Sequence, residues 1–212
     1  TYWQMKKRAG TVGQNGLGPL IGKLAATQSS LRVHLMGHSF GARLVSFAIK
    51  GLPADALKPA STLKSVSLLQ GAFSHFAFTD SLPMHPGQQG ALAGALQRID
   101  GPLVATYSVH DMAVGWLYPM ASLASGDNAS ALQDQLYEWG AMGHDGAQAV
   151  HATDVPIATV GQKYAFGTGA CNLNGNNIIV QGGPPSGAHG DIFHPEIAWA
   201  VLTAAGVTKV SS

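Results

Sequence analysis

The sequence predicts an α/β fold with a mostly parallel sheet flanked by helices. Short apolar runs that are typical of buried strands alternate with helical stretches, and this alternation favours a parallel sheet covered on both faces. The chain has 212 residues, of which 46% are hydrophobic and 11% charged, so it is large and apolar enough for one domain with a sizeable core. Internal repeats, charge blocks and low-complexity linkers are absent from the sequence, so we expect one domain over residues 1–212.

The first part of the chain predicts two helical segments, a strand, a helix and a second strand. Residues 1–28 are rich in helix-forming residues, and the glycines and proline of GQNGLGPL should force a turn among them. Leu31–Met36 is the first convincing strand. The stretch Arg43–Lys50 has helical spacing and contains neither Gly nor Pro, and we expect its helix to end at Gly51. A second strand is predicted at Leu63–Gln70.

The second part continues the alternation. A helix is suggested at Ala91–Ile99, and a third strand at Pro102–Tyr107. A long Ala-rich stretch follows at 116–150, with helical character around LQDQLYEWGAM, and either forms a cap over the site or packs against the sheet. A fourth strand is predicted at Asn177–Val180. Pro195 then begins a last helix, EIAWAVLTAA, because proline suits the first helical position.

Charge and composition exclude several kinds of partner. Twelve basic and eleven acidic side chains nearly cancel, so no nucleic acid or anionic membrane surface is expected as a partner. Every apolar run is shorter than the roughly 20 residues of a membrane span, so no span is predicted. The single Cys171 cannot form an internal disulfide, and an oxidising compartment is not implied.

The stretch GHSFG, residues 37–41, is the strongest chemical signal. It follows the apolar strand VHLM and directly precedes a helix, which is the strand-turn-helix arrangement of a nucleophile elbow. Such a tight turn strains Ser39, and we expect side chains at Gly37 or Gly41 to collide with neighbouring backbone. The Phe40 N–H would then donate to a developing oxyanion. The alternative is an ordinary glycine-flanked turn between a strand and a helix.

A serine nucleophile requires a histidine base and a carboxylate later in the chain. Asp111 suits the acid because it follows the third predicted strand, although it could instead cap the segment MAVGWL; Asp80 and Asp145 are its competitors. His189 suits the base because it lies between the fourth predicted strand and the last helix, among small neighbours. The alternative base is His194, which looks more like part of a helix start.

Three motifs, in this order, resemble a known family. GHSFG after VHLM, SVHD after the third strand and GAHGDIFHPEIAWAVL near the end resemble a bacterial α/β-hydrolase of the serine esterase/lipase type. The resemblance implies Ser39 as nucleophile, Asp111 as acid, His189 as base and the Phe40 N–H as one oxyanion donor. It further implies hydrolysis of small-molecule carboxylic esters through an acyl-enzyme, without a cofactor. A peptidase, an acyltransferase, a non-catalytic binding module or an inactive fragment are the alternatives.

The chain departs from that family ahead of the serine. Only about 30 residues precede the first predicted strand, although the family places several strands before its nucleophile elbow, and no HGGG-type segment occurs before Ser39. Either the GQNGLG segment supplies the second oxyanion donor, or residues 1–212 are a fragment, as the initial Thr1 suggests. A fragment would need an upstream segment or a second copy to complete its sheet.

Other signals are weaker. GLGPLIGKL resembles a phosphate-binding loop, but Leu24 stands where a Ser or Thr must meet magnesium, so we reject this interpretation. Nine histidines raise the question of a metal, but the sequence has neither an H-E-x-x-H motif nor a Cys pair, and no metal site is expected. Five aromatic residues form either an acyl pocket or core: Phe73, Phe76, Phe78, Trp116 and Tyr118.

Overall fold

A parallel sheet lies at the centre of the computed structural model, which describes residues 2–57, 61–117 and 140–208. Within these residues the sheet has five strands in the order β1-β2-β3-β5-β4, and each neighbouring pair is parallel. The strands are β1 (Val33–His38), β2 (Leu63–Leu69), β3 (Pro102–Tyr107), β4 (Thr153–Pro156) and β5 (Gly169–Asn174). The prediction of a parallel sheet flanked by helices is confirmed.

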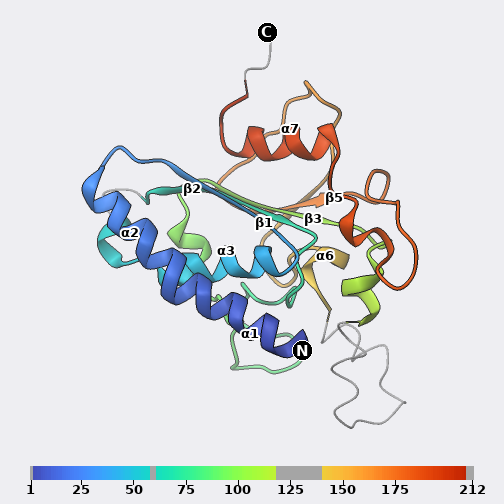
Figure 1. Cartoon of the computed structure of the whole chain (residues 1–212), viewed down its shortest axis with the longest axis horizontal. Coiled ribbons are helices and arrows are strands. Elements are labelled where there is room, and N and C mark those ends of the chain that lie inside the picture. The colour runs from blue at the N-terminus through green and yellow to red at the C-terminus, as the bar shows by residue number, and fades with distance from the viewer. Residues whose placement is uncertain (1, 58–60, 118–139, 209–212) are drawn as a thin grey trace.

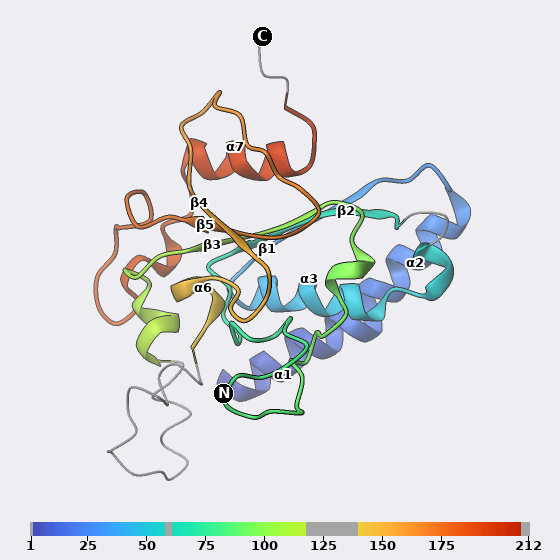
Figure 2. The same cartoon turned by 180° about the vertical axis from the view of Figure 1, so that it is seen from behind.

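Helices cover both faces of the sheet (Figure 1). The helices α1 (Tyr2–Val12), α2 (Gly18–Thr27) and α3 (Phe40–Gly51) lie on one face, and α7 (Pro195–Ala204) lies on the other. The short helix α6 (Met142–Asp145) lies near the end of the sheet where the strands finish (Figure 2). Among the described residues, no helix has both the length and the apolar character needed to cross a membrane.

Two hydrophobic clusters hold the layers together. On the face of α3, side chains such as Val45 and Ile49 pack against Leu63 and Leu103 from the strands. On the opposite face, Ile197 and Ala200 of α7 belong to a second cluster with residues of β2, β3 and β5. Apolar side chains of β2 and β3 enter both clusters, which is why the sequence predicted these two strands well, although β2 also contains Lys64, Ser65 and Ser67.

The predicted turn at GQNGLGPL is wrong. Residues Gly13–Leu17 form a π-helical turn that joins α1 and α2 into one continuous helical segment. The glycines serve close helix packing, since a Cβ at Gly13 would lie 2.0 Å from the Leu44 carbonyl oxygen and one at Gly18 would lie 2.5 Å from the Ala48 oxygen. The widened turn comes just before Pro19, which has no N–H for the regular helical bond.

Two other predicted elements are wrong. Ala91–Ile99 is mostly irregular and holds only a 3₁₀ turn at Leu96–Arg98. Its buried side chains Leu92, Ala95 and Ile99 follow a helical spacing, but Gly94 has φ +75°, which breaks a helix. Asn177–Val180 is a turn after β5 rather than a strand, and it is apolar because Ile179 is fully buried in the second cluster.

The remaining predictions agree more closely with the structure. The strand β3 and the start of α7 at Pro195 are confirmed, whereas β1 extends to His38 and α3 begins at Phe40, so Ser39 alone separates them. Within the described sheet, β1 lies at one edge and pairs with β2 along its whole length. Of the predicted insertion at 116–150, residues 118–139 lie outside the described part of the chain, so the cap prediction is left open.

Candidate active site

Ser39 occupies a strained turn between β1 and α3. Its backbone has φ 57° and ψ −122°, a conformation that side chains of L-residues rarely adopt. The turn is fixed because the Ser39 N–H donates to the Leu69 carbonyl oxygen at 3.0 Å, while the Ser39 carbonyl accepts from the Ala72 N–H at 3.2 Å. The strand and the helix therefore hold the Ser39 hydroxyl at the carboxyl end of the parallel sheet.

The two glycines of the motif have different roles. A Cβ at Gly37 would lie 2.3 Å from the Gly41 carbonyl oxygen, so only glycine fits there, as predicted. The same prediction for Gly41 is wrong, since a Cβ at this position would meet nothing within 4 Å. The close approach of strand and helix therefore depends on the residue before the serine, and the second glycine is not needed for space.

His189 joins Ser39 to Asp111. The His189 ring lies in the 3₁₀ turn Gly187–Gly190, with Nε2 2.8 Å from the Ser39 Oγ and Nδ1 2.8 Å from the Asp111 Oδ2. A carboxylate can only accept, so Nδ1 carries the proton and Nε2 is left to accept from the Ser39 hydroxyl. The side chain of His189 is 17% exposed, whereas that of Asp111 is fully buried.

Asp111 makes contacts of both kinds considered for it, one with a backbone N–H and one with His189. Its side chain is fully buried, and Oδ1 accepts from the Val114 N–H at 3.3 Å, which caps the π-helical turn at Ala113–Leu117. The other oxygen, Oδ2, accepts from His189. The capping bond thereby helps to hold the carboxylate in the orientation that the histidine requires.

Gln70 is a site residue that sequence reasoning missed. Its fully buried side-chain amide donates to the Asp111 Oδ2 at 2.9 Å and to the Gly143 carbonyl at 2.8 Å, and its Oε1 accepts from the Thr106 hydroxyl at 2.9 Å. Gln70 has φ 44°, so this arrangement also strains its backbone. The available signal was a polar residue that closes an apolar strand at its carboxyl end.

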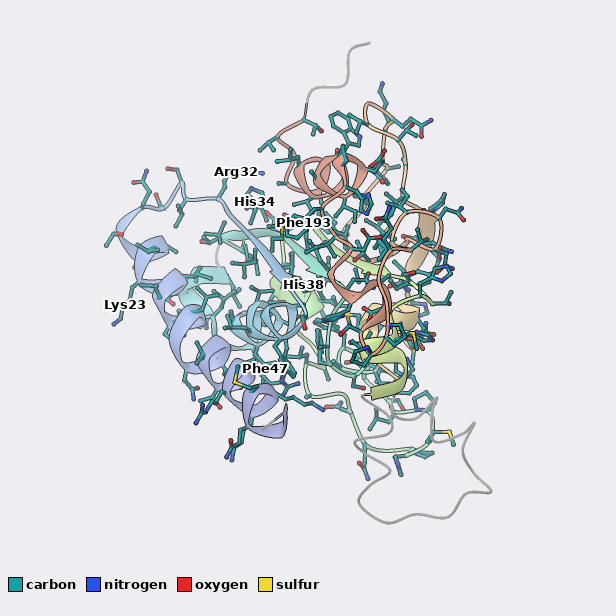
Figure 3. The ribbon with its side chains drawn as sticks, turned by 45° about the vertical axis from the view of Figure 1, so that its right-hand side comes forward. Lys23, Arg32, His34, His38, Phe47 and Phe193 are labelled. Carbon is teal, nitrogen blue, oxygen red and sulfur yellow. The ribbon has the colours of Figure 1, made fainter. Side chains whose placement is uncertain are left out.

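His38 is a second residue near the candidate site that the sequence did not indicate. It is the last residue of β1 (Figure 3). Its Nε2 lies 2.8 Å from the His189 carbonyl oxygen, to which it donates. The centres of the two imidazole rings are 4.9 Å apart. Burial lowers the pKa of His38 below its ordinary value. The hydrogen bond to the His189 carbonyl raises this pKa, but its effect is smaller than that of burial. His38 therefore supports the backbone that carries His189.

The alternative acids, Asp80 and Asp145, and the alternative base, His194, lie in other surroundings. Asp80 is exposed on the connection between β2 and β3. Asp145 lies 2.7 Å from the Nδ1 of the buried His75, and His194 Nε2 lies 2.8 Å from the Asp191 Oδ1. Among the candidate acids and bases, the hydrogen bonds join His189 to Ser39 and Asp111 to His189. Asp145 and His194 bond other side chains instead.

Of the two expected oxyanion donors, the Phe40 N–H has a suitable position in the structure. Phe40 is the first residue of α3, so its N–H lies at the positive end of that helix, next to Ser39. The GQNGLG segment packs along α3, near Leu44, Ala48 and Gly51. These contacts give no support to the alternative in which this segment supplies the second donor.

The aromatic residues and the histidines have mainly structural surroundings. Phe73, Phe76 and Phe78 are buried, and Phe73 and Phe78 belong to the cluster on the α3 face. The Trp116 side chain and all of Tyr118 lie outside the described part of the structure. Among the described residues, no three His, Cys, Asp or Glu side chains gather in a way that would hold a metal ion.

Comparisons with protein-family models, with curated proteins and with solved structures find no match for this chain. The same fold can carry unrelated activities, so the parallel sheet alone assigns none. The function is therefore inferred from the chemistry of the side chains at the carboxyl end of the sheet.

Proposed function

We propose that this chain is a serine hydrolase that cleaves carboxylic esters through an acyl-enzyme, with an α/β-hydrolase fold of the serine esterase/lipase type. One observation carries the proposal: the His189 ring lies 2.8 Å from both the Ser39 Oγ and the Asp111 Oδ2, with Ser39 in a strained turn. The chain order serine, aspartate, histidine and the elbow directly after a parallel strand support the fold assignment.

The reaction follows from the direction of each hydrogen bond. As the Ser39 Oγ attacks the ester carbonyl carbon, its proton passes to Nε2 of His189, and the Asp111 carboxylate stabilises the imidazolium that forms. The tetrahedral oxyanion accepts from the Phe40 N–H at the start of α3. The imidazolium then protonates the leaving alcohol, and an acyl-enzyme on Ser39 remains.

The second half of the reaction reverses these roles. Water gives a proton to Nε2 of His189 while its oxygen attacks the acyl carbonyl, and collapse of this intermediate returns the proton to the Ser39 Oγ and releases the carboxylic acid. No cofactor is required by these steps. The Gln70 amide and the His38 ring hold Asp111 and the His189 backbone in place throughout.

Turnover of a series of p-nitrophenyl esters of increasing acyl length tests the proposal. We expect the parent chain to hydrolyse at least one member, Ser39→Ala to lose about 10⁴-fold or more of kcat/KM, and the exposed control Ser30→Ala to keep it. Activity should fall toward acid pH because a histidine base must be neutral. Activity in Ser39→Ala within about tenfold of the parent would overturn the assignment.

The alternatives predict different results in the same assay. A peptidase would cleave p-nitroanilides of the matching acyl groups better than the esters, and an acyltransferase would accelerate when an alcohol acceptor is added. A non-catalytic binding module or an inactive fragment would turn over none of the esters. Each result is separable from simple unfolding by the far-ultraviolet circular dichroism of the same sample.

A further inference from the structure

The segment that carries His189 connects β5 to α7 and has few apolar contacts of its own. Residues 181–186 of this connection are all exposed, and only Ala188 is buried among residues 181–191. The connection lies at the end of the sheet where the strands finish (Figure 1). Because apolar packing holds this segment only weakly, its hydrogen bonds largely decide where the His189 ring lies.

Backbone bonds fix the turn on the side before His189. The Ala188 N–H donates to the His110 carbonyl oxygen at 2.8 Å. The Ser186 carbonyl accepts from the Ala113 N–H at 3.1 Å. Both of these partners belong to the loop after β3, which also carries the candidate acid. The segment is therefore tied to the acid loop ahead of the histidine.

The Asp191 carboxylate fixes the turn on the side after His189. Its Oδ2 accepts from the N–H groups of Val180 and Gln181, at 2.8 Å and 2.7 Å. Its Oδ1 accepts from the His194 Nε2 at 2.8 Å. The Asp191 side chain is 14% exposed, so most of it is shielded from water. One carboxylate thus joins the beginning of the segment, its end and the residue before α7.

The two N–H donors of this contact lie next to a firmly held residue. Ile179 precedes them and is fully buried in the second hydrophobic cluster, and its carbonyl accepts from the buried Ser108 hydroxyl at 2.7 Å. The segment also closes tightly on itself, since a Cβ at Gly182 would lie 1.8 Å from the Gly187 carbonyl oxygen. Asp191 therefore ties the histidine turn to a fixed point of the core.

The hydrogen bonds of Asp191 also favour its ionised form. Burial by itself raises the pKa of Asp191, but the bonds from its backbone donors and from His194 together lower it more, and the pKa lies below its ordinary value. An ionised carboxylate accepts with both oxygens, and such charge-assisted bonds are stronger than those between neutral groups. The contact is thus suited to holding an exposed segment in one conformation.

We propose that Asp191 is a positioning residue, which keeps the His189 ring between Ser39 and Asp111 by tying the turn that carries it to the loop after β5. The proposal rests on the proposed role of His189 as the base. Nε2 and Nδ1 of the ring each lie 2.8 Å from their partners, so the ring has little room to move. A displacement of about 1 Å at such a site costs about 10²-fold in rate.

Two substitutions of Asp191 separate its bonds from its charge. Asp191→Ala removes every acceptor, whereas Asp191→Asn keeps an oxygen for the two N–H groups and an amide that donates to the other tautomer of His194. With p-nitrophenyl esters we expect Asp191→Ala to lose about 10-fold to 10²-fold of kcat while KM stays within about threefold, and Asp191→Asn to keep kcat within about fivefold. The control is Asp55→Ala, which removes a carboxylate that accepts from the Ala56 N–H in the 3₁₀ turn Ala54–Leu57, and it should leave kcat unchanged.

Proton NMR gives a second readout that needs no catalysis. The His189 Nδ1 proton, held by the Asp111 carboxylate, should give a low-field resonance in the parent at neutral pH, and its loss in His189→Ala identifies it. We expect this resonance to disappear or broaden in Asp191→Ala, because a displaced ring exposes the proton to exchange with water. Asp191→Asn and Asp55→Ala should keep it.

The two readouts distinguish failure of this proposal from failure of the proposed function. If the parent hydrolyses no ester, the proposed function fails and the resonance alone decides the role of Asp191. Should Asp191→Ala fail to fold by circular dichroism, Asp191→Ser replaces it with the same expected losses, because its single oxygen is too short to reach both sides of the turn. A parent without the resonance, a folded Asp191→Ala that keeps it, or an equal loss in Asp191→Asn would overturn the proposal.

Discussion

The Gln70→Met substitution tests the hydrogen-bond network behind the candidate triad. Methionine keeps the length and the unbranched Cβ of glutamine, so the strained φ of 44° costs the same in both chains. It removes the amide that donates to the Asp111 Oδ2 and to the Gly143 carbonyl, and the Oε1 that accepts from Thr106. The substitution therefore changes polar bonds with little change in volume.

The expected loss follows from what each partner retains. Asp111 keeps its bonds to His189 and Val114, and the Gly143 carbonyl keeps the Ser108 N–H at 3.0 Å, so neither is left without a donor. The buried Thr106 hydroxyl loses its acceptor, which costs about 1–3 kcal/mol, and the lost bond to the carboxylate contributes about 1.5–3 kcal/mol. Because such terms are not additive, we expect the free energy of unfolding to fall by about 3 kcal/mol.

Urea denaturation followed by circular dichroism measures this loss, and ester hydrolysis measures its effect on the site. The exposed Gln97→Met is the control and should change the free energy of unfolding by less than about 0.5 kcal/mol. For Gln70→Met we expect kcat/KM to fall by about 10-fold to 10²-fold, because a carboxylate that is less firmly held orients His189 less well. A loss of stability below about 1 kcal/mol, together with unchanged kcat/KM, would refute the reasoning.

Three further predictions concern the strained serine, the choice of base and His38. Ser39→Gly should be about 1 kcal/mol more stable than Ser39→Ala in thermal denaturation, because glycine accepts the φ of 57° without strain; a less stable glycine variant would contradict this. His189→Ala should abolish ester hydrolysis as fully as Ser39→Ala does, and His194→Ala should be milder; the reverse ranking would move the base to His194. Partial burial lowers the pKa of His38 from its ordinary value of 6.5, so the unfolded chain binds more protons there and stability falls as pH drops below about 6.5. His38→Gln should therefore show a shallower fall of Tm between pH 7 and pH 5, and equal slopes would argue against a neutral ring in the folded chain.

The predictable parts of the fold are those in which local pattern and tertiary role coincide. The strands β2 and β3 carry apolar side chains toward both faces of the sheet, and α7 begins at a proline that suits its first turn. The strand-turn-helix pattern around Ser39 was visible for the same reason, since the turn is made by adjacent residues. Asp111 was located because β3 ends a few residues before it, whereas His189 was located by its place ahead of the last helix, since the strand predicted before it, Asn177–Val180, is a turn.

The secondary-structure predictions are wrong where a residue contacts another residue that is distant in the sequence. The strand β5 contains polar Asn172, which is buried because its side chain bonds both the N–H and the carbonyl of Ala147. The apolar Ile179 was assigned to a strand but fills the core from a turn. In GQNGLGPL the glycines allow close packing against α3, which sequence spacing alone cannot distinguish from a turn signal.

Within the site, Gln70 could not be identified from the sequence for the same reason. Its amide reaches Asp111, 41 residues later, and Gly143, 73 residues later, so no local pattern in the sequence connects them. His38 likewise reaches the His189 carbonyl across 151 residues. The candidate catalytic residues follow known sequence patterns, whereas the residues that hold them in place are defined by the folded structure.

Labelling with a fluorophosphonate, followed by mass spectrometry of tryptic peptides, tests the central proposal most directly. The reagent reacts with an activated serine, and trypsin releases the peptide between Arg32 and Arg43, in which Ser39 is the only hydroxyl side chain. We predict one adduct, on this peptide, formed by the parent chain and lost in His189→Ala. An intact, folded parent that forms no adduct, or one that is labelled equally fast without His189, would contradict the proposal.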